Sequence, residues 1–294
     1  MEKEKLWPSW LLYWRRMGSR DISDYLERTP PEKRLILIVW GVLEAHGPWL
    51  SVAADSMMAE VAANKLAYRL YHEKGIQPII FDSFKDIGSY SATRGFPGAV
   101  AIEGWLEYQP GKEKKSPILQ IWRETLSRLQ KEGFNKFFLV NGDGGNWMNY
   151  VHRDWDAGFH SALEKLAKEL NVQFDGANWD QEGGEPWKHG GHHEHAWFNW
   201  LLTGKAPEFD RSAALRAGIE AVSEDNLRTI DGTSFEHLED SERRRSNWAE
   251  IPEQKKLRGI THFSFAEYGR LKNGEIEKDV EDKIDQLMKR IDKV

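Results

Sequence analysis

Apolar strand-like runs alternate with helical segments through most of this chain, and the alternation limits the possible folds more than any other feature. Continuous apolar runs occur at 35–40 (LILIVW), 76–81 (IQPIIF) and 134–140 (FNKFFLV), and 172–178 (VQFDGAN) is a fourth candidate. Such runs are typical of strands buried on both faces. Because helices separate them, the sequence predicts an α/β fold with a parallel sheet covered by helices on both faces.

Helical periodicity fills the intervals between these runs. Apolar residues recur every four positions through 56–74, where Ser56 can cap the helix and Gly75 can end it. Residues 205–258 are charged and weakly periodic, which predicts helices and loops over one edge of the sheet. Further helices are predicted over 117–131, around 163–170 and over 278–294.

Charge and cysteine content exclude several function classes. The 294 residues carry a net charge of −6, so nucleic acid is not expected as a partner. There is no cysteine, so any metal must be held by His and carboxylate side chains. We expect a cytoplasmic protein in which residues 1–30 form an N-terminal arm or helix and residues 31–294 a single α/β domain.

The N-terminal segment LWPSWLLYWRR at 6–16 is rich in aromatic residues. Its apolar part is too short to cross a bilayer, and the acidic net charge disfavours contact with a membrane surface. The segment is expected to be an amphipathic helix packed on its own domain, or else an arm lying on a neighbouring subunit.

Two predicted strands run directly into polar, glycine-containing loops. Glu44 and His46 follow the first strand, two residues apart, so both can face one side of an extended segment. Asp55 lies just before the helix that follows, and Asp143 lies in the NGDGGN loop after the third strand. Ligands of such sheets bind at the carboxyl ends of the strands. A solvated loop and a tight turn are the alternative interpretations.

A histidine-rich tract, HGGHHEHAWF, spans 189–198 and contains Glu194. It is not the helical zinc-protease motif, because Trp197 stands where the second histidine should be. Taken alone, the tract is typical of a polar surface turn.

Together these stretches resemble the creatininase family of metal-dependent amidohydrolases. The family signature E-x-H-G-P-H-L-P followed by G-x-D is matched by Glu44-Ala45-His46-Gly47-Pro48-Trp49-Leu50 and Asp55. N-G-H-G-G-N is matched by 141–146, and H-A-G-x-x-E-T-S by the tract that begins at His189 and includes Glu194. A smaller F-P-G-T motif is matched by 96–99, and RGITHFSFAEYGR resembles the family's C-terminal segment.

The resemblance implies a three-layer α/β/α fold, a homohexamer and a site for one or two divalent ions, Mn or Zn with Fe possible. It implies that Glu44, His46 and Asp55 are metal ligands, with Asp55 bridging if two ions bind. Glu194 would complete the ligand set, and His189 would move protons during ring opening. Asn141 and the neighbouring glycines would form the floor of the site.

Several positions depart from the family pattern. Asp143 replaces a metal-binding histidine, and we expect it to bind the ion directly and to favour an oxygen-preferring ion such as Mn²⁺. The other departures also fall within the motifs: Trp49, Thr93, Ala99 and His195-Ala196. They indicate a changed substrate, so creatinine itself is not expected.

The function predicted from the sequence is hydrolysis of a C–N bond in a small cyclic amide. The alternatives are opening of an oxidised cyclic polyol (keto-inositol) ring and a metal-poor relative without catalysis. Five of the 14 tryptophans lie beside the motifs, namely Trp49, Trp147, Trp179, Trp187 and Trp197. Each alone is better explained by packing, but together they favour a polar ring substrate.

Overall fold

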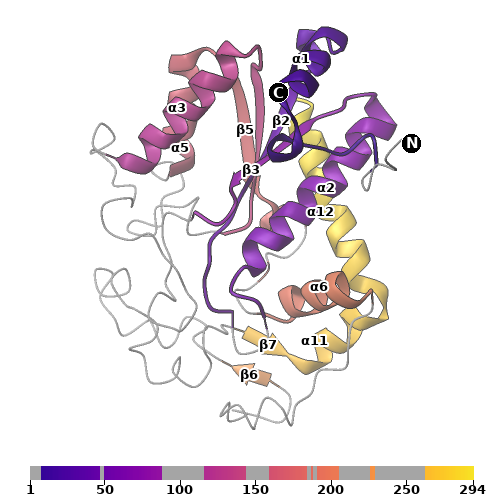
Figure 1. The fold of residues 1–294 in the computed structure, drawn as a ribbon. Helices are drawn as coiled ribbons and strands as arrows, with labels where there is room; N and C mark the ends of the chain where they lie inside the picture. Colours follow the sequence, from indigo (N-terminus) through magenta and orange to yellow (C-terminus); the bar gives the residue numbers. More distant parts are fainter. Residues whose placement is uncertain are drawn as a thin grey trace.

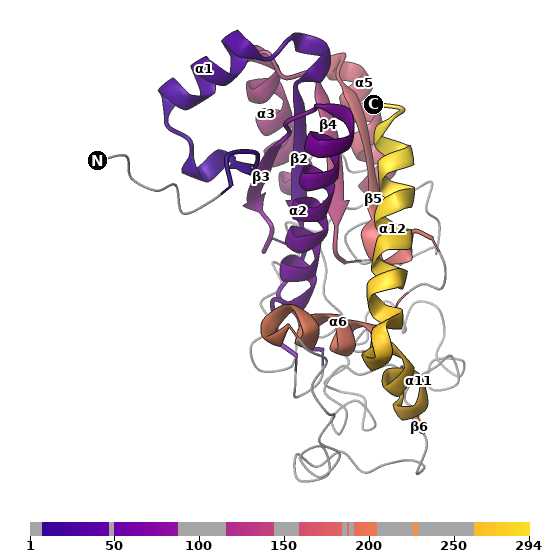
Figure 2. The same cartoon turned by 90° about the vertical axis from the view of Figure 1, so that its right-hand side faces the viewer.

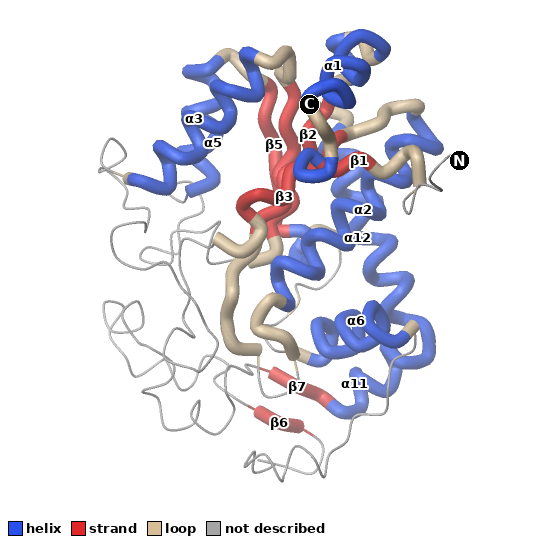
Figure 3. The backbone as a smooth tube through the Cα atoms, in the orientation of Figure 1, coloured by secondary structure: helices blue, strands red, loops and turns tan. Residues whose placement is uncertain are grey.

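A single parallel sheet organises the part of the chain that the computed structural model describes: residues 8–46, 50–87, 116–143, 159–183, 187, 191–204, 226–228 and 262–294. Its five strands have the order β1-β3-β2-β4-β5. They are β1 (Leu12–Tyr13), β2 (Leu35–Trp40), β3 (Ile79–Phe84), β4 (Lys136–Asn141) and β5 (Gln173–Asn178). Figure 3 shows the strands side by side, with helices around them.

Helices cover both faces of this sheet, which gives the three layers that the sequence predicted (Figures 1 and 2). One layer contains α2 (Ala54–Lys74), α6 (His192–Thr203) and α12 (Ile276–Ile291), and the other contains α3 (Pro117–Lys131) and α5 (Phe159–Leu170). The remaining described elements are α1 (Ser19–Arg28), α11 (Phe265–Arg270), short turns at Trp14–Arg16, Pro31–Lys33, Trp179–Gln181 and Leu271–Glu275, and the antiparallel pair β6 (Asn226–Arg228) and β7 (His262–Ser264).

The continuous apolar runs are explained by burial on both faces. Alternate β2 side chains belong to different cores: Leu35, Leu37 and Val39 pack towards α2 and α12, whereas Ile36, Ile38 and Trp40 pack towards α3 and α5. Every residue of β2 is buried, so a polar residue in this strand would lack water on either face.

Two helix ends lie where the sequence predicted them, whereas one predicted capping residue has a different role. Pro117 begins α3, and the Ser116 hydroxyl accepts a hydrogen bond from the Leu119 amide. Gly75 ends α2 with φ +61°, a conformation that glycine adopts readily. Ser56, predicted to cap α2, instead lies inside its first turn and donates its hydroxyl to the Val42 and Lys85 carbonyls.

The N-terminal aromatic segment, expected as a packed helix or as an arm, adds an edge strand at Leu12–Tyr13, and a short helical turn follows at Trp14–Arg16. Leu12 and Tyr13 pair in parallel with β3, opposite Ile79 and Ile80. The Tyr13 hydroxyl contacts Glu60 Oε1 at 3.0 Å and Asn64 Oδ1 at 2.8 Å, both on α2. The backbone of β1 is therefore held by β3 and its Tyr13 side chain by α2, all within this chain.

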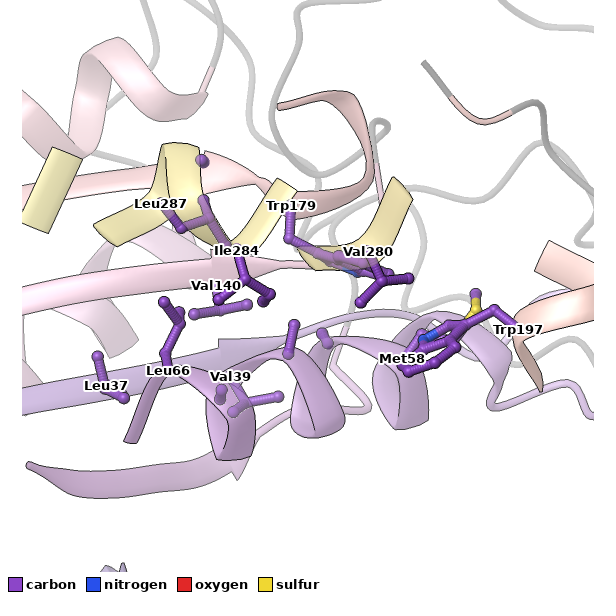
Figure 4. Packing of buried hydrophobic residues seen from close by; sticks show 14 of the residues in the cluster. Leu37, Val39, Met58, Leu66, Val140, Trp179, Trp197, Val280, Ile284 and Leu287 are labelled. Carbon is purple, nitrogen blue, oxygen red and sulfur yellow. The ribbon is translucent and has the colours of Figure 1, made fainter. Parts of the chain in front are cut away.

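Helix α12 lies along α2 and covers the same face of the sheet (Figure 2). Figure 4 shows Ile284 and Leu287 pointing into the core near Val140 and Leu66, and Val280 beside Trp179. On the outer side, three ion pairs join the two helices: Lys65–Glu281, Arg69–Asp285 and Lys74–Asp292. None of the described helices combines the length and apolar character needed to cross a membrane.

Candidate metal centre

Two glycines bring the loops after β2 and β4 against the first turn of α2. A Cβ on Gly41 would lie 2.7 Å from the Ser56 backbone, and a Cβ on Gly142 would lie 2.3 Å from the Asp55 carbonyl oxygen. Real Cβ atoms do not approach other atoms so closely, so only glycine permits this approach. The close packing places the polar residues that follow both strands beside Asp55.

Glu44, His46 and Asp55 form the densest group of candidate ligands in the described chain. One potential ligand atom from each lies within 4.8 Å of the other two, and all three residues are buried. The Glu44 amide donates to the Val52 carbonyl at 2.8 Å, which ties the loop after β2 to the segment entering α2. The fold therefore brings together the loop after β2, which carries Glu44 and His46, and the first turn of α2, which carries Asp55.

The His46 ring is oriented by two contacts. Its Nδ1 lies 3.1 Å from the Glu44 carbonyl oxygen, which can only accept, so the hydrogen-bond pattern assigns a proton to Nδ1. Its Nε2 faces Asp55 Oδ1 at 2.8 Å. A ring held in this tautomer presents the Nε2 lone pair to the cluster when neutral, which is the usual arrangement of a metal-binding histidine.

Glu194 approaches the cluster from the first turn of α6. Its Oε2 lies 4.0 Å from His46 Nε2, and its side chain is buried. The His195 amide bonds to the Gly191 carbonyl at 3.1 Å as the helix begins. The described part of the tract, 191–198, is thus a mostly buried helix start, in contrast to the surface turn that its composition alone indicated.

Asp143 is buried two residues beyond the end of β4, and its negative charge repels that of Asp55. Asn141 Nδ2 donates to the Asp143 carbonyl at 2.5 Å and to Asn178 Oδ1 at 2.6 Å, so the ends of β4 and β5 are tied together. Asp143 is not part of the three-residue cluster, but its carboxylate adds to the negative charge of the same site.

Burial and neighbouring negative charge raise the pKa of Asp55 well above its ordinary value. Loss of hydration is the largest cause, followed by repulsion from Glu44, Asp143, Glu194 and Asp180. Asp55 Oδ2 has no hydrogen-bond partner among the described residues. The site therefore concentrates negative charge that a bound cation would balance.

Asp180 was not predicted as a site residue. It lies two residues beyond β5 and is buried. The rule that selected Glu44 and Asp143, an acidic residue just after a strand, also applies to Asp180, but the weaker pattern of 172–178 gave it less weight.

Three of the motif tryptophans are packing residues. Trp179, Trp187 and Trp197 are buried in the core formed by α2, α6 and α12, as Figure 4 shows for Trp179 and Trp197. Trp49, Trp147, the 96–99 motif, Thr93 and His189 lie outside the described residues.

Comparison with solved structures places this fold among the creatininases. A crystal structure of creatinine amidohydrolase (creatininase) matches with a TM-score of 0.56 and 13% identity over 96% of both chains. A structure titled "Creatininase Mn" matches with a TM-score of 0.54 and 13% identity, covering 96% of this chain and 97% of that one. A mutant creatininase of Zn-Zn type matches with a TM-score of 0.53 and 14% identity over the same shares.

The sequence itself gives a consistent result. A search of curated proteins finds no significant match. The family model for creatininase, described as creatinine amidohydrolase, matches residues 17–246. This range includes Glu44, His46, Asp55 and Glu194, the buried polar residues that the fold brings together. The chain therefore belongs to the creatininase family of metal-dependent amidohydrolases.

Proposed function

We propose that this protein hydrolyses a C–N bond in a small, polar cyclic amide at a centre formed by Glu44, His46 and Asp55. The observation that carries the proposal is the buried convergence of these three side chains at the carboxyl ends of the strands, where α/β sheets bind their ligands. Membership of the family supports the reaction class, and the substrate is the part that we propose.

The donor set fits a divalent cation. It offers one imidazole nitrogen and several carboxylates, and Asp55 Oδ2 has no partner in the described part of the chain. Glu44, Asp55, Asp143 and Glu194 carry a formal charge of −4 when ionised, which two divalent ions would balance. Mn²⁺ and Zn²⁺, the ions in the titles of two structural matches, both suit mixed nitrogen and oxygen ligands.

We propose Glu44, His46, Asp55, Asp143 and Glu194 as the residues that hold the ion or ions. A divalent ion at such a site supplies Lewis acidity, which polarises a carbonyl and makes water more acidic. The Glu44 carbonyl orients His46, so that its Nε2 is available without rearrangement of the ring. We assign His189 the transfer of a proton to the leaving nitrogen when the ring opens.

Substrate screening tests this function. The full-length protein is stripped with a chelator, reloaded with Mn²⁺ or Zn²⁺, and incubated with a panel of cyclic amides and keto-inositols. We expect metal-dependent ring opening of a cyclic amide, absent from the stripped protein. Turnover of keto-inositols alone would replace the proposed substrate class with the alternative one.

Two Glu→Gln variants provide the matched pair for this screen. Glu194→Gln removes a carboxylate from the centre and should reduce metal content and turnover together. Glu27→Gln alters an exposed residue of α1, at the opposite end of the sheet from α6 (Figure 1), and should leave both unchanged. Equal metal content in the two variants would contradict the ligand assignment.

We further propose that the active protein is cytoplasmic, that it forms the homohexamer which the family resemblance implies, and that residues 31–294 are one domain. Light scattering measures this directly, because six copies of a 34.1 kDa chain differ sixfold in mass from the monomer. A monomer with full activity would refute this assembly.

A further inference from the structure

We propose that the C-terminal helix α12 is a positioning element of the metal centre, acting through Trp187 on the start of α6. This inference rests on the proposed metal-binding function. The family match ends at residue 246, so α12 lies beyond the matched range, and none of the proposed ligands is on it.

Three residues between β5 and α6 are attached to α12; we call Glu182, Gly183 and Trp187 the anchor residues. The buried ammonium group of Lys283 donates to the Glu182 carbonyl at 3.3 Å and to the Gly183 carbonyl at 3.1 Å. Arg290 Nη1 contacts Glu182 Oε1 at 2.7 Å, and the same guanidinium binds Asp175 in β5. These contacts fix the path of the chain as it leaves the sheet.

Gly183 shows how closely this path follows α12. Its φ is +63°, and a Cβ there would lie 2.9 Å from Gln286 Cγ and 3.1 Å from the Asp282 carbonyl oxygen. A side chain at this position would push the anchor residues away from the helix.

Trp187 carries the attachment towards the centre. Its indole Nε1 donates to Asp279 Oδ2 at 2.6 Å, and the Lys283 ammonium lies 5.7 Å from its ring centroid. The Trp187 ring also stacks on His193, with centroids 5.7 Å apart and planes 17° apart. His193 directly precedes Glu194, whose Oε2 lies 4.0 Å from His46 Nε2.

The contacts therefore run from Asp279 through Trp187 to His193, the residue adjacent to Glu194. In sequence, the residues between Trp187 and α6 are 188–191, and His189 is one of them. Groups that orient a ligand from outside the coordination sphere commonly change metal affinity by about 10- to 100-fold when altered. We infer that the hydrogen bond between Trp187 and Asp279 sets the position from which Glu194 reaches the ion.

Trp187→Phe removes the donor while retaining a ring to stack on His193. The matched control is Trp122→Phe, because Trp122 on α3 is fully buried and its Nε1 has no partner among the described residues. Three measurements are made on the full-length proteins: Zn²⁺ affinity by calorimetry, the visible spectrum of bound Co²⁺, and amide hydrogen exchange over 187–203.

Trp187→Phe is expected to weaken Zn²⁺ binding about 10-fold, to alter the Co²⁺ spectrum and to speed exchange at the start of α6. Trp122→Phe should change none of these. Zn²⁺ affinity and exchange equal to wild type would overturn the proposal, as would equal losses in both variants. If wild type binds no ion, the proposed function fails, but faster exchange confined to the α6 start of Trp187→Phe still supports the anchoring.

Discussion

Replacing Asp55 by Asn should stabilise the metal-free protein while it removes metal binding. Asp55 and Glu44 offer oxygen atoms within 4.8 Å of each other, and two unit charges at that separation repel by about 3.5 kcal/mol at an effective dielectric constant of 20. The asparagine side chain has nearly the same shape as that of Asp55, and its amide nitrogen can donate to His46 Nε2. The substitution therefore removes the charge and retains most of the packing.

Protonation limits how large this effect can be. Asp55 has an ordinary pKa of 3.8, and the folded protein raises it, so the folded state can relieve the repulsion by binding a proton. The raised pKa of Asp55 can therefore lower the free energy of unfolding by at most about 4 kcal/mol at pH 7 and about 1.6 kcal/mol at pH 5. Because the folded state binds the extra proton, its stability falls as pH rises above about 4 and levels off above the folded pKa.

Urea denaturation in the presence of a chelator measures the free energy of unfolding at pH 5 and pH 7. We expect Asp55→Asn to gain about 1–3 kcal/mol at pH 7 and less at pH 5. With Mn²⁺ at 100 times its dissociation constant, wild type alone should gain about 2.7 kcal/mol. Asp24→Asn, an exposed change on α1, should stay within about 0.5 kcal/mol of wild type throughout. A metal-free Asp55→Asn protein that is less stable than wild type at pH 7 would refute the reasoning.

Other changes test the remaining parts of the centre. Asp143→His should shift the metal preference from Mn²⁺ towards Zn²⁺ in calorimetric titrations, and should move the acidic limb of the pH–rate profile to lower pH. An unchanged metal preference would place Asp143 outside the ligand set. His189→Gln should reduce kcat by about 100-fold or more with metal content unchanged, whereas loss of metal would make His189 a ligand. Gly142→Ala should destabilise the fold by about 1–3 kcal/mol in urea, because its methyl group would lie 2.3 Å from the Asp55 carbonyl oxygen; wild-type stability would show that the loop can move aside.

The strand and helix pattern was predictable wherever burial determines the residues. The run at 35–40 is a strand, and the run at 134–140 contains most of β4, which begins at Lys136, because both faces of the sheet are covered. The helix over 117–131 has the predicted bounds because Pro117 suits a first turn. The run at 76–81 begins three residues early: Ile79 opens the strand, since the Ile76 amide still bonds to the Leu70 carbonyl at the end of α2.

The rest depended on contacts between distant residues. Nothing local in Leu12 and Tyr13 indicates an edge strand, because its partner is β3, about 67 residues later. Ser56 has the side chain of a capping residue, but the close approach of the loops after β2 and β3 uses its hydroxyl inside the helix. In the same way, the spacing of Glu44, His46 and Asp55 suggested ligands, whereas their buried cluster arises from the packing of Gly41 and Gly142 on α2.

The position of α12 has a consequence for how the protein is made. Strands β2 and β4 and helix α2 are translated well before α12, which covers their shared apolar face. The 150 residues from the end of β4 to the end of α12 take about 8–30 s to synthesise at typical rates of about 5–20 residues per second. During this interval the nascent chain exposes the core that Ile284 and Leu287 later fill. Protection by a chaperone on the ribosome is therefore most needed before α12 emerges.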